Sequence, residues 1–155
     1  RTPAQVFFVA STQEEVGLRG ARTATYAVEP DMGIAVDVTH ATSPGTGPSE
    51  AFPIDKVCLA TGPNIHKGLL KMLRETAKRI RVDCSIEVAS GPTGTDAAAM
   101  QLSRGGVPCV LISLPLKYMH TVVETLSLDV VRETGRLMAA FIDDAARGWE
   151  AIQWY

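Results

Sequence analysis

The sequence has 155 residues, of which 46% are apolar and 21% charged, and its formal net charge is −2. This balance suits one soluble globular domain with a sizeable core. The chain lacks the excess of positive charge that is typical of nucleic-acid-binding domains. No apolar run approaches the roughly 20 residues of a membrane span, so we expect no membrane or nucleic-acid partner.

The first half of the chain predicts three strands and a helix. The apolar residues 5–12 and 32–39 read as buried strands, and residues 55–62 as a third, shorter strand. A short helix is expected at 20–28, ending before Pro30. Residues 41–53 are dense in Gly, Pro and Ser, which is typical of a loop.

The second half predicts three helices and two strands. In residues 64–80 the apolar side chains recur every three or four positions, as in an amphipathic helix: Ile65, Leu69, Leu70, Leu73, Ala77 and Ile80. The other expected elements are a strand at 84–90, a helix at 96–105 capped near Thr95 or Asp96, a strand at 107–115, a loop at 116–121 and a terminal helix at 127–148.

Continuous apolar strands that alternate with helices predict an α/β fold whose sheet is covered on both faces. In such folds, binding sites lie at the ends of the strands. The three cysteines, Cys58, Cys84 and Cys109, lie in apolar segments and form no CxxC pair. We expect buried thiols in a reducing, cytoplasmic compartment.

Polar residues at predicted strand ends are the candidates for chemistry. Glu14 and Glu15 follow the first strand, Asp37 lies between Val36 and Val38, Asp96 opens a helix, and His120 follows the last strand. Each has a structural alternative. Asp96 suits a helix N-cap, His120 an ordinary loop histidine, and the two glutamates the first turn of a helix. Asp37 is harder to explain, because a buried carboxylate is costly unless it is paired.

Together these residues fit a metal site. Carboxylates and imidazole are ligands of zinc, cobalt and manganese. Neighbouring residues of an extended chain point to opposite sides, so one glutamate could bind a metal while the other acts on water as a general base.

Two long motifs resemble the tetrahedral (TET) aminopeptidase family, which includes glutamyl and deblocking aminopeptidases. They are "FFVASTQEEVGLRGARTATYAVEPDMGIAVDVTHA", residues 7–41, and "GPTGTDAAAMQLSRGGVPCVLISLPLKYMHTVVE", residues 91–124. The resemblance implies a three-layer α/β/α fold of the zinc-exopeptidase type, with a mixed and largely parallel sheet. It also implies a metallopeptidase that removes amino-terminal residues from peptides, with homo-oligomers that reach dodecamers in the family.

The resemblance assigns a role to each candidate. Glu14 is the general base, Glu15 and His120 bind one metal, and Asp37 binds the other. Asp96, with Gly94 and Thr95, supports the substrate or a ligand. Lys117 stands where many relatives have Arg, so the contact of that side chain is not implied.

The family's two-metal site also needs a histidine and a bridging aspartate that precede the Glu-Glu pair. Residues 1–13 hold no His, Asp or Glu. We therefore expect this chain to be the carboxy-terminal portion of a catalytic domain, lacking the upstream catalytic segment and an inserted β domain. By itself, this chain would offer only an incomplete site for the two divalent ions, whether zinc, cobalt or manganese. It would have no useful peptidase activity.

Two other functions remain open at this point. Some family members carry endoglucanase labels, but glycosidases need two carboxyl groups that face each other about 5 to 9.5 Å apart. A non-catalytic assembly module is the second alternative, because a partial domain exposes sheet edges and apolar faces.

Overall fold

A computed structural model of the protein describes residues 2–47 and 51–152. Its elements, in chain order, are α1 (Arg19–Val28), β1 (Gly33–His40), β2 (Val57–Thr61), α2 (Lys67–Ile80), β3 (Cys84–Val88), α3 (Asp96–Gln101), β4 (Cys109–Lys117), β5 (Thr125–Leu126), α4 (Leu128–Arg147) and the 3₁₀ turn η1 (Trp149–Ala151).

The sheet is mixed and mainly parallel. Its strand order is β1-β4-β2-β3, and β5 pairs with the end of β4. The pairs β1–β4 and β2–β3 are parallel, whereas β2–β4 is antiparallel and short. The register of the β1–β4 pair sets Asp37 beside Ser113, so the carboxyl ends of these two strands meet at one edge.

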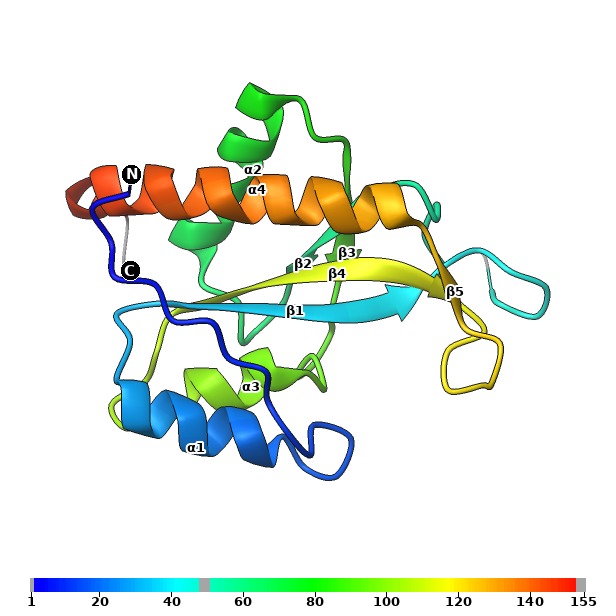
Figure 1. The fold of residues 1–155 in the computed structure, drawn as a ribbon, viewed down its shortest axis with the longest axis horizontal. Helices are drawn as coiled ribbons and strands as arrows, with labels where there is room; N and C mark the ends of the chain where they lie inside the picture. The colour runs from blue at the N-terminus through cyan, green and yellow to red at the C-terminus, as the bar shows by residue number, and fades with distance from the viewer. Residues whose placement is uncertain (1, 48–50, 153–155) are drawn as a thin grey trace.

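Helices cover both faces of the sheet (Figure 1). α2 and α4 pack together on one face, and α1 and α3 lie together on the other. The core between these layers is aliphatic, with Leu59, Leu69, Leu73, Ile112, Leu137 and Phe141 fully buried. The predicted three-layer α/β/α fold with a mixed, largely parallel sheet is confirmed.

The amphipathic helices form where the periodicity predicts them. α2 begins after His66, whose imidazole Nδ1 accepts a hydrogen bond from the Leu69 amide at 3.2 Å and caps the helix. A polar contact joins α2 to α4, because Asp144 accepts hydrogen bonds from the Thr76 hydroxyl at 2.6 Å and from Arg79. Thr76 is buried, so this contact fixes the register of the two helices at the edge of the core.

The predicted strand at 5–12 is wrong, because these residues form no strand. Val6, Phe7, Phe8 and Val9 are exposed, and Phe8 has 86% of its surface accessible. An extended segment becomes a strand only when its backbone pairs with a neighbour, and no described strand pairs with it. The apolar side chains of this segment are therefore not fully covered by other described residues.

Two boundaries also differ from prediction. The helix expected at 96–105 ends at Gln101. Beyond this end, Arg104 adopts a positive φ of 51° and forms an ion pair with Glu29 at the end of the neighbouring helix α1. β4 continues past Pro115, which the strand tolerates because its ladder with β2 extends only to Ser113. β5 and η1 were not predicted. The loop expected at 41–53 lies partly outside the described residues.

The three cysteines are free. Cys84 is only partly buried, whereas Cys58 and Cys109 are buried as predicted. Burial raises the pKa of both thiols to about 12, which keeps them protonated and unreactive at neutral pH. Within residues 2–47 and 51–152, no helix is long and apolar enough to cross a membrane.

Candidate functional site

The Glu14–Glu15 pair lies in a tight turn that leads into α1. The amides of Gly17 and Leu18 both donate to the Glu14 carbonyl, at 3.1 and 2.9 Å. The pair therefore does not lie on extended chain, so the expected extended geometry is wrong, and the alternative that it begins a helix is not observed either. The turn presents the Glu15 side chain to solvent and leaves Glu14 half-buried.

Gly20 fixes this turn against the helix. Its amide donates to the Thr12 carbonyl at 2.8 Å, so the first turn of α1 lies directly on the backbone that precedes the glutamates. A Cβ added at Gly20 would lie 2.3 Å from the Thr12 nitrogen and 2.5 Å from its oxygen. Only glycine allows this approach.

His120 lies in the loop after β4 and reaches the turn from the other side. Its Nε2 lies 3.1 Å from Oε1 of Glu15, although the two residues are 105 positions apart. The backbone of His120 has a positive φ of 62°, which is unusual for a residue with a side chain. Its amide donates to the Glu124 carboxylate at 2.7 Å, and this contact holds the unusual conformation in place.

Asp37 and Glu14 belong to one cluster of negatively charged side chains. Burial raises the pKa of Glu14, and the charges of Asp37, Glu15 and Asp96 raise it further, while His120 lowers it. Burial also raises the pKa of Asp37, against the lowering effect of the Val38 amide, which donates to Asp37 Oδ1 at 2.8 Å. Burial therefore favours the neutral form of these carboxyl groups, and the repulsion between their negative charges favours a cation nearby.

Asp96 is held by a side chain rather than serving as a cap. The N-cap of α3 is Thr95, which makes no capping hydrogen bond with its side chain, and Asp96 follows inside the helix. Oδ2 of Asp96 accepts a hydrogen bond from the Ser11 hydroxyl, and its Oδ1 is buried with no partner among the described residues. Gly94 precedes these residues with a positive φ of 70°.

Three residues near the site were not predicted: Ser11, Glu87 and Glu124. Ser11 anchors Asp96, and Glu124 anchors the His120 loop. The Glu87 carboxylate accepts from the Thr39 hydroxyl at 2.6 Å, and its charge raises the pKa of Asp37. The alternation of β3 could have placed Glu87 on one face of the sheet, but no sequence pattern identifies Ser11 or Glu124.

The donor chemistry of this cluster fits a divalent cation, and the ligand set is partial. Glu15 and His120 are adjacent oxygen and nitrogen donors, and the surrounding carboxylates repel one another until a positive charge joins them. In the part of the chain that the structure describes, however, no three His, Cys, Asp or Glu side chains come together as a metal-binding group. Asp37 contributes to the field without contacting the Glu15–His120 pair.

Comparison with known proteins gives one consistent family. The model of the M42 glutamyl aminopeptidases matches residues 1–137. A lysyl aminopeptidase of Pyrococcus furiosus is 39% identical over 142 residues, which cover 91% of this chain and 41% of that protein.

Solved structures agree with the sequence comparison. An aminopeptidase from Desulfurococcus kamchatkensis superposes with a TM-score of 0.82 at 34% identity, covering 93% of this chain and 43% of that one. The TET1 peptidase of Pyrococcus horikoshii, which assembles into a tetrahedron or a large octahedral shell, gives 0.69 at 28% identity, covering 85% and 39%. The chain thus spans about two fifths of the length of the relatives it matches.

Proposed function

Because the chain belongs to the M42 glutamyl aminopeptidase family, we propose that it carries part of the catalytic centre of a metal-dependent aminopeptidase. The observation that carries the proposal is the contact between Glu15 and His120, at 3.1 Å across 105 residues of sequence. An exposed ion pair adds little to stability, so stability alone does not explain this contact. The carboxylates of Glu14 and Asp37 lie close enough to interact electrostatically with Glu15.

Each residue has a role in this proposal. Glu15 and His120 hold one divalent ion, and Asp37 contributes to a second. Zinc, cobalt and manganese all suit these donors, and the bound ions would supply the Lewis acidity that activates water at neutral pH. Glu14 accepts the proton of the attacking water and returns it to the departing amine. Its raised pKa suits an acid–base group that both takes and gives a proton.

The substrate side of the site is proposed to lie along Gly94, Thr95 and Asp96. Asp96 keeps one buried carboxylate oxygen without a partner among the described residues, which leaves it able to accept a hydrogen bond from a peptide or to orient a ligand. Peptides with a free amino terminus are the proposed substrates. Assembly into a homo-oligomer is proposed by similarity to the Pyrococcus horikoshii peptidase.

The proposal includes an incomplete site in this chain. Glu15 and His120 are two donors, and a catalytic zinc site has three protein ligands. We propose that the 155 residues form the carboxy-terminal portion of a catalytic domain. The chain matches 41% of the length of the Pyrococcus furiosus enzyme. The isolated chain is expected to bind metal ions weakly and to show no useful peptidase activity.

Titration with cobalt tests the ligand roles. The visible absorption of Co²⁺ should change weakly with the chain, and His120→Ala or Glu15→Gln should remove that change. His40→Ala is the matched control, because His40 is an exposed histidine outside the cluster. Tight binding of two ions would contradict the incomplete site, and an unchanged titration in His120→Ala would contradict the ligand assignment.

Kinetics of the gene product that carries this chain test the reaction. Glu14→Gln should lower kcat by about 10²–10⁴-fold, as expected for loss of a general base, while metal content stays unchanged. A chelator should abolish hydrolysis of aminoacyl substrates. Cleavage of a glucan that persists in the chelator would overturn the peptidase and favour the glycosidase alternative.

A further inference from the structure

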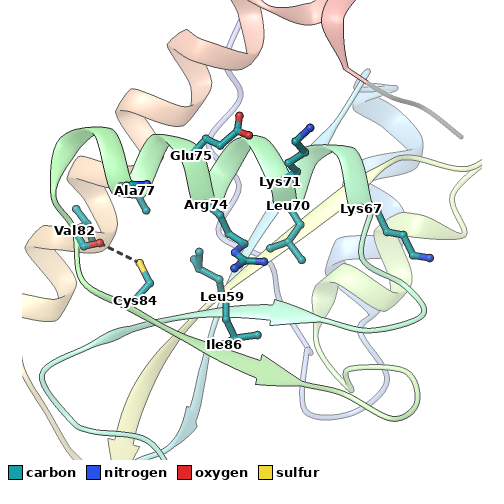
Figure 2. A pocket seen from close by; sticks show the side chains of 11 residues that line it. Leu59, Lys67, Leu70, Lys71, Arg74, Glu75, Ala77, Val82, Cys84 and Ile86 are labelled. Carbon is teal, nitrogen blue, oxygen red and sulfur yellow. Dashed lines mark hydrogen bonds between the residues drawn. The ribbon is translucent and has the colours of Figure 1, made fainter.

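A groove separate from the carboxylate cluster lies between α2 and the β2–β3 side of the sheet (Figure 2). It has a volume of about 600 Å³, and none of the candidate site residues line it. Leu70 and Arg74 reach from α2 toward Leu59 and Ile86 on the strands. The groove therefore has an apolar floor beneath an overhanging helix.

The strand beside this groove is an open edge of the sheet. β3 is the terminal strand, and β2 is its single strand neighbour in the described part of the chain. The Ala89 amide donates to the Thr61 carbonyl at 2.8 Å, so alternation along a parallel ladder turns the peptide groups of Cys84, Ile86 and Val88 outward. These groups have no strand partner among the described residues and can pair with a further strand.

The edge lacks three of the features that normally prevent strand addition. Natural edge strands carry Lys, Pro or a bulge that blocks pairing. β3 has none of these, and its exposed side chains are apolar, with Ile86 38% and Val88 77% accessible. Its one charged residue, Glu87, is engaged by Thr39.

The wall of the groove is strongly basic. Lys67, Lys71, Arg74 and Lys78 recur every three or four residues along one side of α2, and Glu75 is the one acid in the lining. None of these four cations forms an ion pair with a described residue. This local excess of positive charge contrasts with the chain's net charge of −2.

We propose that the groove binds an extended acidic peptide segment, which adds as a strand to β3 beneath α2. Backbone hydrogen bonds to the outward groups of Cys84, Ile86 and Val88 provide the pairing, as in other strand-addition complexes. Apolar side chains of the segment cover Ile86 and Leu59, and its carboxylates meet the cations of α2. This binding does not use the carboxylate cluster and is independent of the proposed peptidase activity.

The test uses a seven-residue peptide of alternating Val and Glu, blocked at both ends so that an aminopeptidase has no free terminus to act on. Adding it to the ¹⁵N-labelled chain should shift the amide resonances of Cys84–Val88. Lys67→Glu together with Arg74→Glu should weaken binding by about tenfold, because two exposed charge pairs are lost. A rise to high salt should also weaken it.

Control variants distinguish an effect of the cations in the groove from an effect of the net charge of the chain. Arg22→Glu with Arg132→Glu makes the same change in net charge on α1 and α4 and should leave binding unchanged. A peptide N-methylated at alternate residues should not bind, because it cannot pair with a strand edge. Glutamate at position 67 suits the first turn of α2, and circular dichroism would verify that the charge-reversed variant is folded.

The proposal would be overturned by the absence of a resonance shift in β3 with the acidic peptide, by equal affinity for the N-methylated peptide, or by equal weakening in the control pair. Tighter binding of a single-stranded oligonucleotide through the same cations would also overturn it and would assign the groove to nucleic acid.

Discussion

Gly20 and Gly135 are both helical glycines, and the structure gives them opposite requirements. A Cβ at Gly20 would collide with the backbone of Thr12, whereas a Cβ at Gly135 would meet no atom within 4 Å. The first glycine permits a close contact that fixes the turn of Glu14 and Glu15. The second only weakens α4, because glycine is a poor helix former.

Gly20→Ala should therefore destabilise the protein by about 1–3 kcal/mol, since backbone atoms must move to admit the methyl group. Gly135→Ala should stabilise it by up to about 1 kcal/mol. Urea unfolding followed by circular dichroism measures both. Equal effects of the two substitutions would show that the contact with Thr12 is not restrictive.

Asp144 gives a prediction that depends on pH. Burial raises the pKa of its carboxyl, but the hydrogen bonds from Arg79 and Thr76, with the charge of Arg79, lower it overall. A lowered pKa in the folded state contributes stability above the unfolded value near 4, and this contribution is lost as the pH falls through the folded pKa.

Asp144→Asn should thus reduce the free energy of unfolding by about 1 kcal/mol at pH 7, and the difference from the wild type should shrink below about pH 4. Urea unfolding between pH 3 and 8 measures this. Asp143→Asn, which breaks an exposed pair with Arg147 inside α4, should cost less. A difference that stays constant across this range would contradict the assignment.

Among the secondary-structure elements, the segment 5–12 and helix α4 show what the hydrophobic pattern does and does not determine. Both are rich in apolar residues, yet Phe141 of α4 is fully buried while Phe8 is 86% accessible. A helix satisfies its backbone internally and needs only a surface to cover. A strand needs a neighbour in addition, and the described residues provide none for 5–12.

Phe8→Ala should change the free energy of unfolding by less than about 0.5 kcal/mol, as expected for an exposed site. Phe141→Ala should lower it by about 3–5 kcal/mol, because it leaves a cavity in the core. The sequence pattern alone would give the two the same effect. A large loss in Phe8→Ala would mean that this phenylalanine is buried in solution.

Elements that depend on local sequence could be predicted, whereas contacts between distant residues could not be predicted from the residue pattern. α1, α2, α4 and the strands β1 to β4 could be predicted because their periodicity and capping are local. The contact of Glu15 with His120 could be expected only from the resemblance to a family, since it depends on a tertiary fold that joins residues 105 apart. The supporting contacts of Ser11 and Glu124 depend on loop geometry and could not be predicted.

The whole molecule exposes an apolar surface and carries little net charge to oppose association. Val6, Phe7, Phe8 and Val9 are exposed beside one another, and the net charge is only −2. Contiguous exposed apolar residues promote self-association.

The isolated chain should therefore show an apparent mass above 16.6 kDa that rises with concentration in size-exclusion chromatography with light scattering. Phe7→Ser with Phe8→Ser should reduce that rise. Val122→Ser with Val123→Ser is the control, since those valines are also exposed but lie in the loop before β5. A constant monomer mass at every concentration would contradict the prediction.

The parallel pairing of β1 with β4 also bears on how the protein folds. Its register joins Gly33 to Cys109, residues separated by 109 − 33 = 76 positions. Closing so long a loop costs chain entropy before any contact repays it, which makes non-local strand pairs slow to form. Asp37 lies on one strand of this pair and His120 follows the other. The cluster is thus assembled by contacts between residues far apart in the chain, and we expect it to appear late in refolding, after the local helices α2 and α4.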